Sequence, residues 1–145
     1  MSPLVRRLVE SCGLALVDEL SLDDFLDGVA AQPAHALLFL SGDGAQRPET
    51  GDVAVVFPEL LAAFAGRLRG AVVAPGAEEK LRARLCAYVS PSLVVMRGRD
   101  PVGVLPKIYD WSDYLAKIEG FLHPSAAIIA GAKRPQVEIS FSSGA

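Results

Sequence analysis

The chain has 145 residues, the usual length of one domain, and 51% of them are hydrophobic while 21% are charged. This composition predicts a folded globular protein and excludes disorder over most of the length. The net charge of −3 argues against binding to nucleic acid, because that needs lysine and arginine side chains clustered on one face.

Neither a membrane anchor nor an export signal is expected. No apolar run approaches the roughly 20 residues that a spanning helix needs. Arg6-Arg7 and the apolar residues after them have the look of a twin-arginine export signal, but Glu10 and Asp18-Glu19 interrupt the run and no cleavage site follows. Cys12 and Cys86 form neither a C-x-x-C pair nor a disulfide framework, so we expect buried thiols and a cytoplasmic location.

Helices and strands alternate in the first half of the chain. The predicted elements are a helix over 3–11, a strand over 13–17, a helix from 21 to 32, a strand over 36–40, a polar loop over 41–52 and a further helix. Ser21 with Asp24 is typical of a capping box at the start of the second helix. Pro58 either starts or kinks the helix after the polar loop.

The second half continues the alternation and closes with a hairpin. It predicts a strand over 70–74, a helix over 78–88, strands over 92–97 and 102–108, and a helix over 111–122 capped by Asp110 and Asp113. In the helix over 78–88 we expect Tyr88 to face inward and Glu78 to pair with Arg82 in solvent. In the last helix we expect Trp111 on the buried face.

This order predicts one α/β domain over 1–123, with a mixed central sheet and helices on both faces. The Ser-, Gly- and Ala-rich remainder, 124–145, is predicted to be a flexible or loosely docked tail with one possible strand over 137–141. Pro91 stands directly before an apolar strand. It is either an ordinary strand-start proline with a trans bond or a cis-proline that faces a binding groove.

The element order resembles that of thioredoxins over roughly residues 14 to 122. Val89-Ser90-Pro91-Ser92-Leu93 is similar to the thioredoxin cis-proline segment, and Pro58 is similar to the proline in the helix after the dithiol. The resemblance therefore favours a cis bond at Pro91. The dithiol itself is missing, since Ala45, Gln46, Arg47 and Pro48 occupy its place, so thiol exchange has no nucleophile there.

One thioredoxin-like family shares this combination, the HyaE/HupG family of accessory proteins for uptake nickel-iron hydrogenases. The likeness is carried by Gly103-Val104-Leu105 with Ile108 and Trp111, by Pro48-Glu49, and by the segment from Val89 to Val94. The resemblance implies a cytoplasmic, non-enzymatic chaperone without a cofactor. Its implied partner is the precursor of the hydrogenase small subunit, recognised through its twin-arginine signal peptide. Other hydrogenase accessory proteins and a second copy of the chain are further implied partners.

Within that scheme, the segment that begins at Ser90 and Pro91 is the first candidate for capturing an extended peptide by backbone hydrogen bonds. Glu49, Asp52 and Glu59 could pair with the arginines of a signal peptide, and Arg47 lies beside them at the place of the dithiol. The alternative is that the three acids are ordinary solvated residues. Phe57 and Val56 either contact the apolar part of the peptide or belong to the core.

Two other functions remain open from the sequence. The chain could be a thiol-dependent redox protein that uses Cys86 or Cys12, although we expect Cys86 on the buried side of a helix, as a small hydrophobic residue. It could also be a thioredoxin-like scaffold with an unrelated partner. A metal site is not expected, because His35 and His123 are far apart and neither has a second ligand at a recognised spacing.

Overall fold

The structure, a computed structural model, describes residues 3–31, 35–42 and 48–129. In chain order the elements are α1 (Pro3–Glu10), β1 (Ala15–Val17), α2 (Leu22–Ala31), β2 (His35–Leu40), α3 (Pro48–Ala63), β3 (Leu68–Val73), a 3-10 turn (Pro75–Ala77), α4 (Glu78–Leu85), β4 (Ser92–Arg97), β5 (Asp100–Pro106) and α5 (Trp111–Leu122). None of the described helices combines the length and the hydrophobicity that crossing a membrane requires.

The strands form one sheet in the order β1-β3-β2-β4-β5. β1, β3 and β2 run parallel, whereas β4 is antiparallel to β2 and forms a hairpin with β5. The hairpin turn at Gly98-Arg99 uses a left-handed backbone at Gly98, which glycine adopts without strain. The predicted mixed α/β sheet is confirmed.

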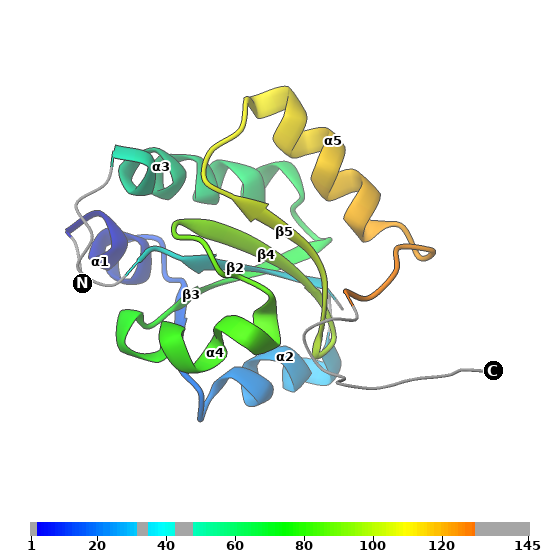
Figure 1. The fold of residues 1–145 in the computed structure, drawn as a ribbon, viewed down its shortest axis with the longest axis horizontal. Helices are drawn as coiled ribbons and strands as arrows, with labels where there is room; N and C mark the ends of the chain where they lie inside the picture. The colour runs from blue at the N-terminus through cyan, green and yellow to red at the C-terminus, as the bar shows by residue number, and fades with distance from the viewer. Residues whose placement is uncertain (1–2, 32–34, 43–47, 130–145) are drawn as a thin grey trace.

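Helices cover both faces of the sheet, and α1, α3 and α5 lie on one side while α2 and α4 lie on the other (Figure 1). The side chains of β2 show why helices are needed on both faces. Successive side chains of a strand point to opposite faces, so Leu37 and Phe39 enter one core while Leu38 and Leu40 enter the other. A strand that is buried on both faces must be apolar throughout, as this one is.

Two details at the starts of helices differ from the expectation. The capping interaction before α2 is made by Asp18 and Ser21: Asp18 accepts the N–H groups of Leu20 and Ser21, and the Ser21 hydroxyl accepts the N–H of Asp18. These hydrogen bonds lower the pKa of Asp18. The polar loop predicted over 41–52 is too long, because α3 begins at Pro48, the residue type favoured in a first turn, and contains Pro58 in its interior.

Helix α4 is shorter than predicted, although Leu81 and Leu85 are buried as expected. It ends at Leu85, and Cys86 follows with a left-handed backbone, so Tyr88 lies outside the helix with 63% of its surface exposed instead of facing inward. Glu78 does not pair with Arg82 in solvent. It is buried, and Arg82 pairs with Glu79 at 3.2 Å.

The last helix begins at the expected place but buries a different aromatic residue. Trp111 is 45% exposed, and Tyr114 is fully buried with its ring edge-on to Tyr109. Asp110 occupies the N-cap position, yet its side chain makes no capping hydrogen bond. After α5 the chain returns to β5, where the Ile129 N–H donates to the carbonyl of Pro101 at 2.9 Å. The possible strand over 137–141 lies outside the described residues.

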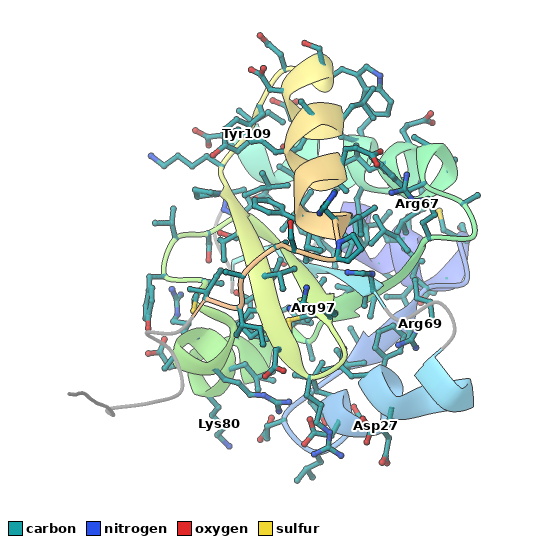
Figure 2. All side chains as sticks on the ribbon, turned by 90° about the vertical axis from the view of Figure 1, so that its right-hand side faces the viewer. Asp27, Arg67, Arg69, Lys80, Arg97 and Tyr109 are labelled. Atoms are coloured by element: carbon teal, nitrogen blue, oxygen red, sulfur yellow. The ribbon has the colours of Figure 1, made fainter. Side chains whose placement is uncertain are left out.

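Several arginines gather at the end of the sheet where β2 begins, and Figure 2 looks onto this end. Arg67 forms an ion pair with Glu119 at 2.8 Å, and Arg69 donates to the carbonyls of Phe25 and Leu26. Arg97 donates to the carbonyl of Ala126 at 2.9 Å. Each of these guanidinium groups is used within the fold, so we assign them a structural role.

The packing of β5 against α5 predicts that Gly103 tolerates no side chain. A Cβ atom there would overlap the ring of Phe121, whereas a Cβ at Gly120 in α5 would meet nothing. We expect Gly103→Ala to lower the free energy of unfolding by about 1–3 kcal/mol, while Gly120→Ala raises it by about 0.5–1 kcal/mol. Urea denaturation of both variants measures this, and equal stabilities would contradict the contact.

The environment of His35 predicts a pH-dependent stability. Its Nε2 is buried with no hydrogen-bond partner among the described residues, and burial, then Arg97 and Arg67, lowers its pKa below the usual 6.5. The unfolded chain therefore binds a proton more readily, so stability should fall as the pH drops below 6.5 and level off below the lowered pKa.

Substitution of each histidine in turn tests this linkage. Denaturation between about pH 7.5 and about pH 5.5 should show a flatter pH dependence for His35→Gln than for the parent chain. The control is His123→Gln, a substitution of the other histidine, whose side chain is exposed. A parent slope that survives in His35→Gln would refute the assignment.

Candidate functional site

Four segments meet at the opposite end of the sheet, which we call the Pro91 end. They are the end of β2 with the start of α3, the start of α4, the segment over 86–92, and the segment over 106–113 between β5 and α5. Backbone pairing brings them together, because Leu40 of β2 lies opposite Ser92 of β4, and Ser92 lies opposite Pro106 of β5.

Buried polar residues hold these segments in place. Within the described residues, the buried polar or charged side chains are those of Ser41, Thr50, Glu78 and Ser92. The Thr50 hydroxyl donates to the carbonyl of Ser41 at 3.1 Å, and both carboxylate oxygens of Glu78 lie 3.1 Å from the N–H of Gly42. Ser92 donates to the carbonyl of Val89. Buried polar groups need such partners, and here the partners are backbone groups of the connecting segments.

The Ser90-Pro91 peptide bond is cis, which settles the alternative that the sequence left open. Pro91 is buried and Ser90 is half-buried. The carbonyl of Pro91 accepts the N–H of Lys107 at 2.8 Å, so the segment before β4 is tied to the segment after β5. Because Pro91 is buried, a partner cannot reach its ring and can contact only the more exposed residues around it.

Lys107 and Tyr114 connect Pro91 to helix α5, a link that sequence reasoning missed. Lys107 has a left-handed backbone with φ of 63°, and its carbonyl lies 3.5 Å from the hydroxyl of Tyr114. Burial raises the pKa of Tyr114, and the carboxylate of Asp52 raises it further. Tyr114 packs in the same core as Val53, the residue after Asp52. No sequence pattern marks Lys107, because its conformation depends on the tertiary contacts around it.

The candidate acids lie along α3 and not in a loop. Glu49 is half-buried in the first turn, and Asp52 and Glu59 are exposed. Asp52 and Glu59 are seven residues apart, so they share one face of the helix at a separation of about 10 Å along its axis. Asp110 and Asp113, at the start of α5, are also exposed. Arg47 lies outside the described residues.

Exposed apolar side chains concentrate near the same end. In the described part of the chain, the exposed large hydrophobic residues are Leu16, Leu20, Val55, Tyr88, Val89, Ile108 and Trp111. The last four belong to the two segments tied together by the Pro91–Lys107 hydrogen bond, and Val55 lies one turn after Asp52. Phe57 is fully buried and offers no binding surface, while Val56 is partly buried against the same core.

An open pocket of about 310 Å³ lies beside these residues, and we call it the Cys86 pocket. It is lined by Cys86, Tyr88, Val89, Ser92, Val104 and Pro106. No charged side chain contributes to its lining. The volume is at the lower end of the range for ligand pockets, which is roughly 300–1,000 Å³.

The expectation of buried thiols is wrong. Cys12 is exposed after α1, and Cys86 is half-exposed at the C-terminal end of α4. Neither thiol lies at a helix N-terminus, where the helix dipole would favour a thiolate. In the described residues, no group of three or more histidine, cysteine, aspartate and glutamate side chains is arranged to hold a metal ion.

Comparisons with known proteins agree on one family. The model of the family described as "Hydrogenase-1 expression protein HyaE" matches residues 4–114. The hydrogenase expression/formation protein HupG of Rhizobium leguminosarum bv. viciae is 52% identical over 139 residues, which cover 96% of this chain and 93% of the relative. HoxO of Azotobacter vinelandii, also a hydrogenase expression/formation protein, is 39% identical over 120 residues, 83% of this chain and 78% of HoxO.

Solved structures lead to the same family and fold. A HupG structure from Rhodopseudomonas palustris CGA009 is 46% identical, covers 74% of this chain and 94% of its own, and superposes with a TM-score of 0.52. Chlamydomonas reinhardtii thioredoxin f2 is 18% identical over 77% of this chain and 98% of its own, with a TM-score of 0.56, and shows the shared thioredoxin-like fold. The chain belongs to the HyaE family of hydrogenase expression/formation proteins.

Proposed function

We propose that this protein is a non-enzymatic chaperone that binds, in the cytoplasm, the twin-arginine signal peptide of a [NiFe] hydrogenase small-subunit precursor. The observation that carries the proposal is the meeting of exposed apolar and exposed acidic side chains at the Pro91 end. The names of the relatives support the connection with hydrogenase formation.

The chemistry of a signal peptide matches this surface. Such a peptide has a positively charged segment followed by an apolar segment of about 7–15 residues. Guanidinium groups form charge-assisted hydrogen bonds with carboxylates, and Glu49 and Asp52 present carboxylates near Pro91, with Glu59 further along the same helix. The exposed Tyr88, Val89, Ile108 and Trp111 supply apolar area for the rest of the peptide.

Charge reversal at two of the acids tests the proposal. We expect Glu49→Lys combined with Asp52→Lys to weaken binding of a synthetic twin-arginine signal peptide about tenfold or more at low ionic strength. The difference should shrink as salt is added, because salt screens exposed charges. Glu59→Lys, farther along α3, should have a smaller effect. Isothermal titration calorimetry measures the affinities, and thermal unfolding should be nearly unchanged.

The matched control reverses two exposed acids elsewhere, Glu10→Lys with Asp24→Lys. It changes the net charge by the same amount, so an equal loss of affinity would show that only the overall charge matters. A peptide whose arginine pair is replaced by glutamine should bind weakly to the parent protein. If that peptide binds as tightly as the original, the acidic residues do not recognise arginine and a scaffold with an unrelated partner becomes the better hypothesis.

The rival function, thiol-dependent redox chemistry, would require catalytic turnover, whereas a non-enzymatic chaperone should show none. Cys86 sits at a helix C-terminus, where the dipole opposes a negative charge, and no second cysteine lies close to it in the sequence. We therefore expect no insulin reduction and no peroxide turnover above the background of a Cys86→Ser variant. Turnover that the parent shows and this variant lacks would overturn the chaperone proposal.

A further inference from the structure

The Cys86 pocket lies at the same end of the sheet as the proposed arginine-binding acids, but on the other face. Its walls come from the segment over 86–92 and from β5, on the face of the sheet that α4 covers. Val104 packs partly against the core beneath α4, and Tyr88 and Val89 form the exposed rim. The Ser92 hydroxyl, a polar group of the lining, already donates to the carbonyl of Val89.

The pocket and the acids offer different chemistry to a peptide. The exposed acids Asp52, Asp110 and Asp113 lie on α3 and at the start of α5, on one face of the sheet. Beside the pocket, Arg82 is occupied, because it pairs with Glu79 at 3.2 Å and donates to the carbonyl of Tyr88 at 3.0 Å. No charged side chain lines the pocket itself, so it favours an apolar segment, while the acids favour arginines.

We propose that the Cys86 pocket is the subsite for the apolar segment of the signal peptide, while the peptide's arginines lie over the acids of α3 and α5. This inference rests on the proposed function and adds the direction in which the peptide lies. Burial of aliphatic side chains in a pocket of this size supplies affinity that is insensitive to salt. The arginines then contribute the salt-sensitive and partner-specific part.

The position of Cys86 provides a direct test. A Cys12→Ser variant leaves Cys86 as the single thiol, and its rate of alkylation by iodoacetamide is measured with and without a synthetic twin-arginine signal peptide. At a peptide concentration about ten times the Kd, most of the protein is bound, so we expect alkylation to slow about tenfold. The reciprocal Cys86→Ser variant reports on Cys12, whose rate should not change.

Two further measurements test whether the pocket itself, and not the acidic residues, binds the apolar segment of the peptide. A peptide that keeps its arginines but carries serines in place of its apolar leucines should leave Cys86 reactive. Val89→Asp, which places a charge at the 39%-exposed rim, should weaken binding of the original peptide about tenfold. Leu20→Asp is the control, because Leu20 is 85% exposed beside β1, at the other edge of the sheet.

The outcomes distinguish the two proposals. If the peptide binds in an arginine-dependent way while Cys86 stays reactive and Val89→Asp has no effect, the pocket is not the apolar subsite and the proposed function stands without it. If calorimetry detects no binding of the peptide, both proposals fail. Protection of Cys86 together with loss of affinity in Val89→Asp, but not in Leu20→Asp, supports both.

Discussion

The pairing of β2 on both of its edges is the constraint on which the rest of the structure depends. It pairs in parallel with β3 and antiparallel with β4, and five of its six residues are fully or almost fully buried. Because its carboxyl end lies opposite the beginning of β4, the start of α3 is brought to the segment that contains Pro91. Strand order alone thus brings these segments together, whether or not the chain retains a dithiol.

The side chains that stabilise this end differ from those that could bind a partner. Thr50 and Glu78 are buried and use their polar atoms on Ser41 and Gly42, so they fix the backbone. Trp111, Tyr88 and Val89 are exposed on the segments so fixed. In the proposed function this backbone frame therefore presents apolar and acidic groups at the Pro91 end. Binding to such a surface loses little conformational entropy in the protein itself.

Much of the fold could be predicted from the sequence because its strands are short, apolar and separated by clear turn residues. The run from Ala36 to Leu40 is an example, since only a strand covered on both faces is apolar throughout. The orientations of individual side chains were harder to predict. Tyr88 and Trp111 continue helical patterns of apolar residues, yet α4 ends at Leu85 and α5 turns Tyr114 inward. Glu78 belongs to a run of charged residues that is typical of a solvated helix face, yet it is buried and its carboxylate accepts the N–H of Gly42.

The candidate site could be predicted only in part, because it too depends on tertiary contacts and on where helices end. The cis bond at Pro91 followed from resemblance to a family and not from local propensity. The role of Lys107 was not predicted because it comes from its backbone N–H and carbonyl, which contact Pro91 and Tyr114, and not from its side chain. The Cys86 pocket depends on where α4 ends, and helix ends are poorly determined by sequence patterns.

The most direct test of the central claim is a titration of the isotope-labelled protein with a twin-arginine signal peptide, followed by heteronuclear NMR. If the peptide binds at the Pro91 end, the amide shifts that change belong to residues 49–55, 86–92 and 104–113. The amides around His35, Arg67 and Arg97 at the opposite end should not change. Shifts that gather at that opposite end, or along β1, would contradict binding at the Pro91 end.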